Sequence, residues 1–227
     1  MKYQLEFSSL WAYWPQFLSG AWTTIQFTFL ATVLGLVIGI LGAIARRSGL
    51  LWVRTIAGAY VEIVRNTPFL IQIFFLFFGL ASMGFRMPIF VAAVLAMVIN
   101  VGAYSTEIIR AGIEAVHPSQ IEAAESLGLS RFQIYKDIIL RPALERVYPS
   151  LTSQFTLMML MSSVTSQVSA EELTGAANNI QSVTFRSMET YLIVGLLYLL
   201  LTLLLKSGFW SLGQVLFPRR RRLGTSL

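Results

Sequence analysis

Asn66, Thr67 and Pro68 interrupt a long apolar run over residues 52–81, and such an interruption can bind a ligand. Thr67 can cap a new helix that has Pro68 at its first position. At 1.5 Å per residue, this break lies about 22 Å from the start of the run. Helices broken at such a depth in a membrane present free N–H groups to anionic ligands. The sequence therefore predicts a carboxylate-binding helix start here, with Gln72 one turn further on as a second hydrogen-bond donor.

An ordinary proline kink explains the same residues equally well. In that case Glu62 and Arg65, which are three residues apart, form an ion pair on one helix face. The sequence leaves both interpretations open.

A second polar run follows another apolar segment and contains Ser162, Ser163, Thr165, Ser166, Gln167 and Ser169. Lipid cannot satisfy so many hydroxyl and amide groups, so we expect this run to face a cavity or a partner subunit. The candidate residues of a substrate pathway are therefore Thr67, Pro68, Gln72, Met161, Ser163 and Thr165.

Enzymatic chemistry has no support in this sequence. There is no G-x-x-x-x-G-K-[ST] motif to hold the phosphates of ATP, and no G-x-S-x-G or H-E-x-x-H motif. The chain has no cysteine, and its single histidine, His117, is expected in a loop. We therefore predict no catalytic residue and no cofactor or metal site.

Composition identifies an integral membrane protein. Of the 227 residues, 56% are apolar and 12% are charged, and the mean hydropathy is +0.68. A membrane-spanning helix needs about 20 residues, so about five spans fit this length as one domain, residues 1–227. The expected fold is all-α, with spans at residues 18–45, 52–81, 88–106, 148–168 and 190–217.

The distribution of basic residues predicts the orientation of these spans. Lys and Arg mark the cytoplasmic side of a membrane. One side carries most of them: Arg46, Arg47, Arg54, Arg110, Arg131, Lys136, Arg141, Arg146 and Arg219 to Arg222. The other side has only Lys2, Arg86 and Arg186. The amino terminus is therefore expected outside and the carboxyl terminus inside.

The polar segment between the third and fourth spans carries the capping signals of two short helices. Ser119 and Glu122 have the spacing of one capping box, and Ser130 and Gln133 have that of a second. Between them, Gly128 stands where a helix ends on a left-handed residue. The sequence thus predicts a helical hairpin on the cytoplasmic surface, where it can bind another protein.

The second hairpin helix is expected to end no later than Arg141, because Pro142 disfavours helix at the residue before it. Residues 124–130 also resemble the start of a DNA-binding helix-turn-helix unit. That interpretation is disfavoured because the chain has no second, basic, soluble domain. We expect no nucleic-acid partner.

Four small residues in the first span, Ala31, Gly35, Gly39 and Ala43, recur at a spacing of four. Such a stripe allows close approach of another helix. The external connection, residues 171–189, is expected to be either a docking surface for a binding protein or a solvated loop.

The hairpin segment resembles the EAA loop of ABC-transporter inner-membrane permeases, through Glu122-Ala123-Ala124, Gly128 and Ile138-Ile139-Leu140. Further residues resemble the polar amino-acid branch of that family: Tyr104, Glu107, Arg110, Gly112, Ile113, Gln120, and Arg65, Thr67, Pro68 and Gln72 within residues 60–80. The chain departs from the family pattern in two places. Arg141 stands before the proline of the loop, and Leu160-Met161 replaces a frequent Lys-Asp pair.

This resemblance implies the type I importer fold and a multi-pass subunit of the bacterial inner membrane that takes up polar amino acids. Its implied partners are a second permease, two cytoplasmic ATPase subunits that hold ATP and magnesium, and an external substrate-binding protein. The coupling loop would cover about residues 107–146, with Glu122, Ala123, Ala124, Leu127 and Gly128 at the ATPase contact. Arg65, Glu107 and Arg110 would be structural. The alternative is a membrane scaffold that binds a soluble partner through the hairpin without transport.

Overall fold

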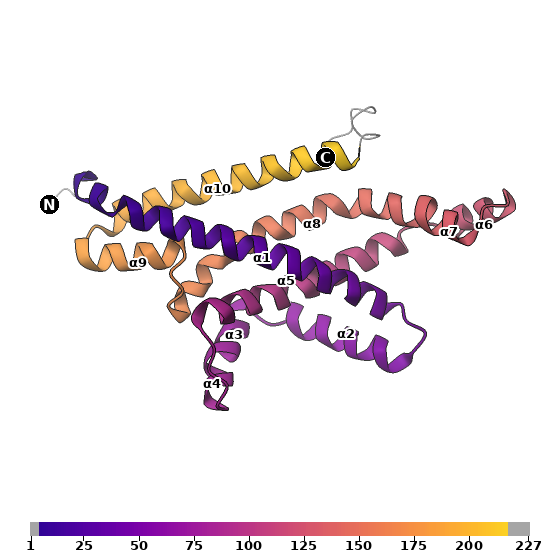
Figure 1. Ribbon diagram of the computed structural model, residues 1–227, viewed down its shortest axis with the longest axis horizontal. Coiled ribbons are helices and arrows are strands. Elements are labelled where there is room, and N and C mark those ends of the chain that lie inside the picture. The colour runs from indigo at the N-terminus through magenta and orange to yellow at the C-terminus, as the bar shows by residue number, and fades with distance from the viewer. Residues whose placement is uncertain (1–4, 218–227) are drawn as a thin grey trace.

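The computed structural model describes residues 5–217, and every element in that part of the chain is helical (Figure 1). The α-helices are α1 (Trp14–Arg46), α2 (Leu51–Arg65), α3 (Phe69–Phe74), α4 (Leu80–Ser82), α5 (Ile89–Glu114), α6 (Pro118–Ser126), α7 (Arg131–Gln133), α8 (Arg141–Met161), α9 (Leu173–Thr184) and α10 (Ser187–Leu216). The 3-10 helices are η1 (Ser8–Tyr13) and η4 (Ser162–Val168), and the π-helical segments are η2 (Phe75–Gly79) and η3 (Ile134–Leu140). Lys2 and Arg219 to Arg222, which contribute to the charge argument, lie outside the described residues.

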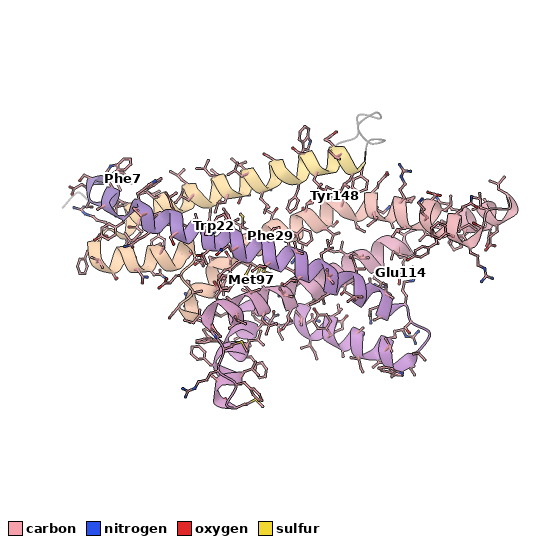
Figure 2. The ribbon with its side chains drawn as sticks, in the orientation of Figure 1. Phe7, Trp22, Phe29, Met97, Glu114 and Tyr148 are labelled. Atoms are coloured by element: carbon pink, nitrogen blue, oxygen red, sulfur yellow. The ribbon has the colours of Figure 1, made fainter. Side chains whose placement is uncertain are left out.

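The long helices α1, α5, α8 and α10 run along the long axis of the molecule (Figure 1). Met97 of α5 is fully buried at the centre of the bundle, whereas Trp22 and Phe29 of α1 project outward (Figure 2). An apolar exterior of this kind suits a lipid environment. The predicted all-helical membrane fold is therefore confirmed.

Within residues 5–217, three helical segments are long and apolar enough to cross a membrane: Ser8–Arg46, Ile89–Glu114 and Ser187–Leu216. The pair Leu51–Arg65 and Phe69–Ser82 forms a fourth if it counts as one span, and its two parts are bent by 109°. The predicted fourth span, residues 148–168, falls on α8 and η4 and is not in this set.

The small-residue stripe of α1 lies against α5, and all four of its residues are buried. A Cβ added to Gly35 would lie 2.5 Å from Cγ1 of Val101, and one added to Gly39 would overlap Ser105. The two backbones thus approach more closely than larger side chains would permit.

The second hairpin helix does not end at Arg141, so that prediction is wrong. Residues 131–161 form one continuous helix, through α7, η3 and α8. Pro142 has no N–H and its ring would collide with a carbonyl of the preceding turn in a regular α-helix. The π-helical turns of Ile134–Leu140, which end two residues before Pro142, widen the helix and can absorb this mismatch.

Most of the connection over residues 171–189 is helix α9 (Leu173–Thr184), so the alternative of a solvated loop is wrong. Its buried face packs against α1 and α10 in a cluster that contains Phe17, Ala21, Leu173, Ala177, Ile180 and Val194. Glu172 caps the helix by accepting a 2.9 Å hydrogen bond from the backbone N–H of Gly175.

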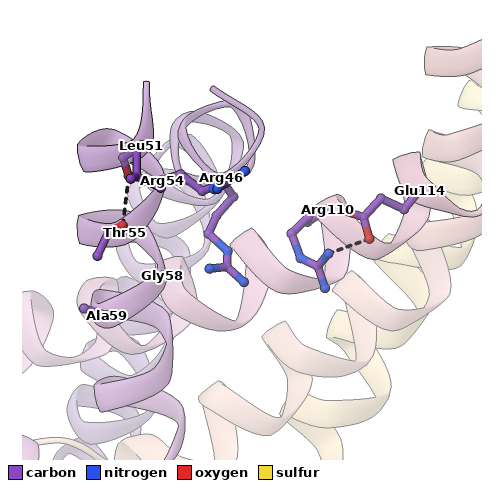
Figure 3. Close-up of a pocket in the computed structure, with 8 residues that line it drawn as sticks. All are labelled: Arg46, Leu51, Arg54, Thr55, Gly58, Ala59, Arg110 and Glu114. Atoms are coloured by element: carbon purple, nitrogen blue, oxygen red, sulfur yellow. Dashed lines mark hydrogen bonds and ion pairs between the residues drawn. The ribbon is translucent and has the colours of Figure 1, made fainter. Parts of the chain in front are cut away.

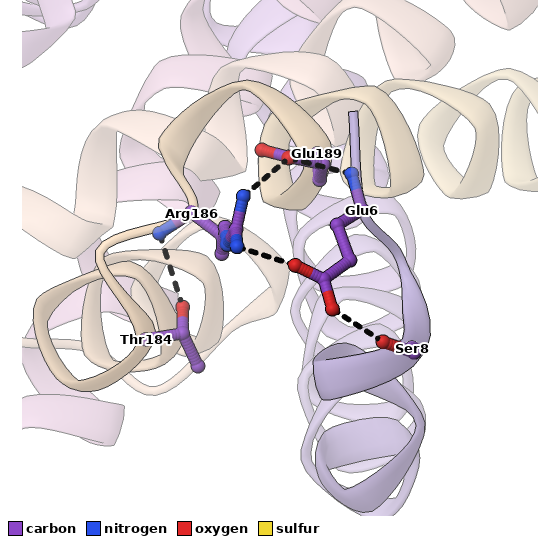
Figure 4. Close-up of polar contacts among 5 residues, drawn as sticks. All are labelled: Glu6, Ser8, Thr184, Arg186 and Glu189. Carbon is purple, nitrogen blue, oxygen red and sulfur yellow. Dashed lines mark hydrogen bonds and ion pairs between the residues drawn. The ribbon is translucent and has the colours of Figure 1, made fainter. Parts of the chain in front are cut away.

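The start of the chain is tied to the corner between α9 and α10 by a polar clasp of Glu6, Arg186 and Glu189 (Figure 4). Arg186 forms an ion pair with Glu6, and its Nη1 lies 3.6 Å from Oε1 of Glu189. The backbone N–H of Glu6 donates to the same Glu189 oxygen at 3.0 Å. The clasp lies at the end of the bundle opposite the hairpin (Figure 1).

Candidate functional site

The break between α2 and α3 is held by the side chain of Gln72. Its Nε2 donates to the carbonyl oxygens of Val64 and Thr67, at 2.7 and 3.0 Å, and its Oε1 accepts from Nδ2 of Asn100 at 2.9 Å. Gln72 therefore connects α2, α3 and α5. The sequence predicted a substrate contact for this amide, and the hydrogen bonds that it forms here lie within the bend.

Thr67 does not cap the second half of the broken helix, so this prediction is wrong. The helix begins at Phe69, and its cap residue is Pro68. The Thr67 hydroxyl donates back to the carbonyl of Ile63 at 2.8 Å and accepts from Gln72 Nε2 at 3.0 Å. These bonds stabilise the end of α2 and leave Thr67 outside the cap of α3.

Glu62 and Arg65 do not form the predicted ion pair with each other, and each contacts a different residue. Glu62 accepts a 3.0 Å hydrogen bond from Nδ2 of Asn66, and the guanidinium of Arg65 lies 5.4 Å from the ring centroid of Tyr104. The first bond orders the end of α2, and the cation–π contact joins α2 to α5.

The hydroxyls of the second polar run that lie in η4 donate hydrogen bonds to carbonyl groups of the preceding helical turn. Those of Ser162, Ser163 and Thr165 each donate at 2.7 Å to the carbonyl three residues earlier. Ser162 and Thr165 are fully buried within the chain, while Met161 and Ser163 are partly exposed. Of the pathway candidates on this run, Met161 and Ser163 are thus the ones at a surface in this conformation.

The two predicted polar segments lie in one region. Helix α3 packs directly against η4, and its residues Phe69 and Ile73 share a buried cluster with Val168, the last residue of η4. The fold therefore brings the bend of residues 66–68 close to the polar end of the helix that starts in the hairpin.

The hairpin corner has the backbone geometry that the sequence predicts. Gly128 has φ +73°, its N–H donates to Glu125 O at 2.9 Å, and Leu129 N–H donates to Ala124 O at 3.2 Å. These two bonds form a Schellman motif. The capping box of Ser130 and Gln133 is also confirmed.

The start of the hairpin differs from the prediction. The cap of α6 is His117, whose Nδ1 accepts from the N–H of Ser119 at 3.2 Å. Pro118 takes the first helical position, so the helix begins before Ser119 and a capping box with Glu122 is not formed.

The hairpin projects beyond the rest of the bundle (Figure 1) and carries exposed apolar side chains at its tip. Leu127 is 80% and Phe132 is 73% exposed, while Ala124 is buried between the two hairpin helices. Glu122, Ala123 and Gly128 are exposed around them. Large exposed apolar side chains on a polar projection are typical of a protein-binding surface.

Ion pairs order the end of α5 that leads into the hairpin. Arg110 bonds to Glu107 and to Glu114, with 3.0 Å between its Nε and Glu107 Oε2. Further along, Arg146 Nη1 donates to Ala115 O at 2.8 Å, which joins the long helix to the entrance of the hairpin.

Sequence reasoning missed Asn100 and the capping role of His117. Asn100 had a detectable signal, because an amide inside an apolar span needs a partner there. Phe132 was also missed, because an aromatic residue in a short amphipathic helix is usually expected to be buried in the core.

A single family model covers most of the chain. Residues 35–214 match the binding-protein-dependent transport system inner membrane component. The chain belongs to this family. It is a multi-pass permease component of the bacterial inner membrane.

Named relatives and solved structures agree with this assignment. The permease is 34% identical over 204 residues to the glutamine transport system permease protein GlnP of Escherichia coli, covering 89% of this chain and 93% of that one. It is 33% identical over 199 residues to the nopaline transport system permease protein NocM of Agrobacterium fabrum, covering 83% and 82%. A crystal structure of an amino acid ABC transporter with histidines matches with TM-score 0.87 and 36% identity, over 93% of the permease and 99% of that chain. An inward-facing MetNI methionine ABC transporter shares the fold, with TM-score 0.72 and 20% identity over 92% and 98% of the chains.

Proposed function

We propose that this permease is the membrane subunit of an ATP-driven ABC importer for polar amino acids. The names of the similar permeases, which transport glutamine and nopaline, support the substrate class. The observation that carries the proposal is the exposed hairpin at one end of a helix that continues without a break to the polar segment η4.

The hairpin is the proposed docking site for an ATPase subunit. Leu127 and Phe132 would enter an apolar socket on that subunit, and Glu122, Ala123, Ala124 and Gly128 would shape the contact. ATP and magnesium would be held by two such subunits, because the chain has no phosphate-binding loop of its own.

The continuous helix of residues 131–161 would transmit movement of the ATPase to the membrane core. A helix resists bending along its axis, so displacement at α7 reaches Met161 and η4. The bend between α2 and α3 packs in the same region, so the two polar segments would move against each other. Rocking of packed helices between two openings is an established mode of switching.

Two permease subunits, identical or homologous, would enclose the pathway between them, and an external binding protein would deliver the amino acid. Met161, Ser163 and the start of α3 at Pro68 remain the proposed pathway residues. Thr67 and Gln72 would act by fixing the bend, and Thr165 by fixing η4.

The experiment is reconstitution of the permease with its ATPase subunits in vesicles. Addition of the external binding protein loaded with amino acid should stimulate ATP hydrolysis and lead to accumulation of the amino acid. A non-transporting scaffold would bind its partner through the hairpin but give no accumulation, and that result would reject the importer.

A further inference from the structure

A cavity of about 600 Å³ opens at the hairpin end of the bundle, between the end of α1, the start of α2 and the end of α5 (Figure 3). It is lined by Arg46, Leu51, Arg54, Thr55, Gly58, Ala59, Arg110 and Glu114. It lies apart from the bend at residues 66–68 and from η4, so the proposed pathway does not use it.

The three arginines of this cavity differ in their partners. Arg110 is paired with Glu107 and Glu114. Within residues 5–217, neither Arg46 nor Arg54 forms an ion pair. Arg110 takes both carboxylates, so Arg46 and Arg54 are the two cations of the cavity that no carboxylate of the described residues pairs with.

Arg46 is held in place, but one of its N–H donors lacks a hydrogen-bond partner in residues 5–217. Its guanidinium points between α2 and α5, against the backbone of Gly58, where a Cβ would overlap Nη1 (Figure 3). Its Nε is buried and has no hydrogen-bond partner in the part of the chain that the structure describes. The Arg46 guanidinium also has no ion pair in the described residues, so an anionic group in the cavity would stabilise this arrangement by pairing with its charge.

The hydroxyl of Thr55 is already used, because it donates to Leu51 O at 2.9 Å. The ligand must therefore be recognised by charge and by the forked geometry of guanidinium groups, which suits a phosphate or a carboxylate. Next to the cavity, Leu50, Leu51 and Trp52 are exposed, and Trp52 is 64% exposed. Tryptophan is enriched at the boundary between lipid and water.

We propose that this cleft binds a phosphate group, which Arg46 and Arg54 hold between α1, α2 and α5. A phosphate group is negatively charged and can accept from both guanidinium groups, so it complements the two arginines that have no carboxylate partner in the described residues. Leu51 and Trp52 would contact the acyl chain of an anionic phospholipid. Free phosphate shares the recognition chemistry, and the experiment separates the two sources.

The test uses the permease purified in detergent with its ATPase subunits, depleted of lipid. Native mass spectrometry measures binding of short-chain phosphatidylglycerol, of glycerophosphate and of inorganic phosphate. We expect Arg46→Gln and Arg54→Gln each to weaken phosphatidylglycerol binding about tenfold, which corresponds to about 1.4 kcal/mol. Gly58→Ala should weaken it as well without any change of charge, because the new Cβ displaces the Arg46 guanidinium.

Arg47→Gln is the matched control, because Arg47 follows Arg46 at the same helix end but does not line the cavity. Phosphatidylglycerol binding with little binding of glycerophosphate assigns the site to lipid, and equal binding of all three assigns it to free phosphate. The proposal is overturned if none of the three binds. It is also overturned if Arg46→Gln, Arg54→Gln and Gly58→Ala bind like the parent protein, or if Arg47→Gln weakens binding as much as they do.

Discussion

Gly128, at the corner of the hairpin, has a backbone conformation that side chains with a Cβ rarely adopt. Its φ is +73°, and no atom lies within 4 Å of where a Cβ would stand. Gly128→Val therefore adds only backbone strain, of about 1–2 kcal/mol, and we expect it to distort the corner. Uptake, measured per amount of permease in the membrane, should be abolished while the protein still reaches the membrane.

Gly49→Val is the control for this prediction. Gly49 also lies in open space within a connection, but its φ is not positive. It should therefore transport normally. Unchanged uptake by Gly128→Val would show that the corner does not couple the permease to an ATPase.

Gln72 should act on transport through the shape of the bend. Gln72→Leu removes the partner of Asn100 Nδ2 and of the Val64 carbonyl, and each unsatisfied group costs about 1–3 kcal/mol. The variant should unfold at a lower temperature, and its uptake should fall by a similar factor for every transported amino acid. Asn100→Leu should have less effect in the Gln72→Leu background than alone, because the pair is already broken. A loss confined to one kind of amino-acid side chain would place Gln72 at the substrate instead.

At the scale of residues, the sequence predicted local hydrogen bonds well and distant ones poorly. Gly128, Ser130 and Gln133 bond within a few positions, so their spacing is sufficient. Gln72 meets Asn100 across 28 positions, and no spacing rule relates them. His117 was missed because an imidazole can replace the usual hydroxyl or carboxylate cap.

The contact between α1 and α5 depends on the absence of side-chain volume. Gly35→Ala would bring a Cβ to 2.5 Å from Val101 Cγ1 and 2.7 Å from Val101 Cβ. Because Val101 is β-branched, its side chain has few other rotamers that would relieve this overlap. We expect a loss of about 1–3 kcal/mol in stability, measured by thermal unfolding in detergent.

Gly195→Ala provides the comparison for the α1–α5 contact. Gly195 lies in α10 with no atom within 4 Å of an added Cβ, so the same change should leave the unfolding temperature unchanged or slightly raised. Equal effects at Gly35 and Gly195 would mean that helix propensity, and not helix packing, determines the result.

At the scale of elements, periodicity and composition were enough for the long apolar helices and for the break at residues 66–68. They failed at Pro142, because a proline usually ends a helix, whereas this helix continues through Pro142 after the π-helical turns of residues 134–140. They did not decide whether residues 171–189 form a docking surface or a solvated loop. The helix α9 in this segment depends on packing of its buried face against α1 and α10.

At the scale of the whole molecule, the two ends of the bundle are built differently. The hairpin end projects and exposes Leu127 and Phe132, which suits a partner that moves. The opposite end closes on itself, because the clasp joins residue 6 to residues 186 and 189. Motion that enters at the hairpin would therefore meet a fixed point at the far end of α1 and α10.

Arg186 is the residue of this clasp that should matter most. Glu189 is fully buried, and Glu6 is 53% exposed at its side chain. Arg186→Gln removes the cation next to a buried carboxylate, so the free energy of unfolding should fall by about 1.5–3 kcal/mol. Glu6→Gln breaks only an exposed pair and should cost less than about 1 kcal/mol.

Arg86→Gln is the control for the loss of charge, because Arg86 is exposed and forms no ion pair in the described residues 5–217. Thermal unfolding of the three variants in detergent ranks them, and an Arg186→Gln variant as stable as Arg86→Gln would show that the clasp does not fix this end of the molecule.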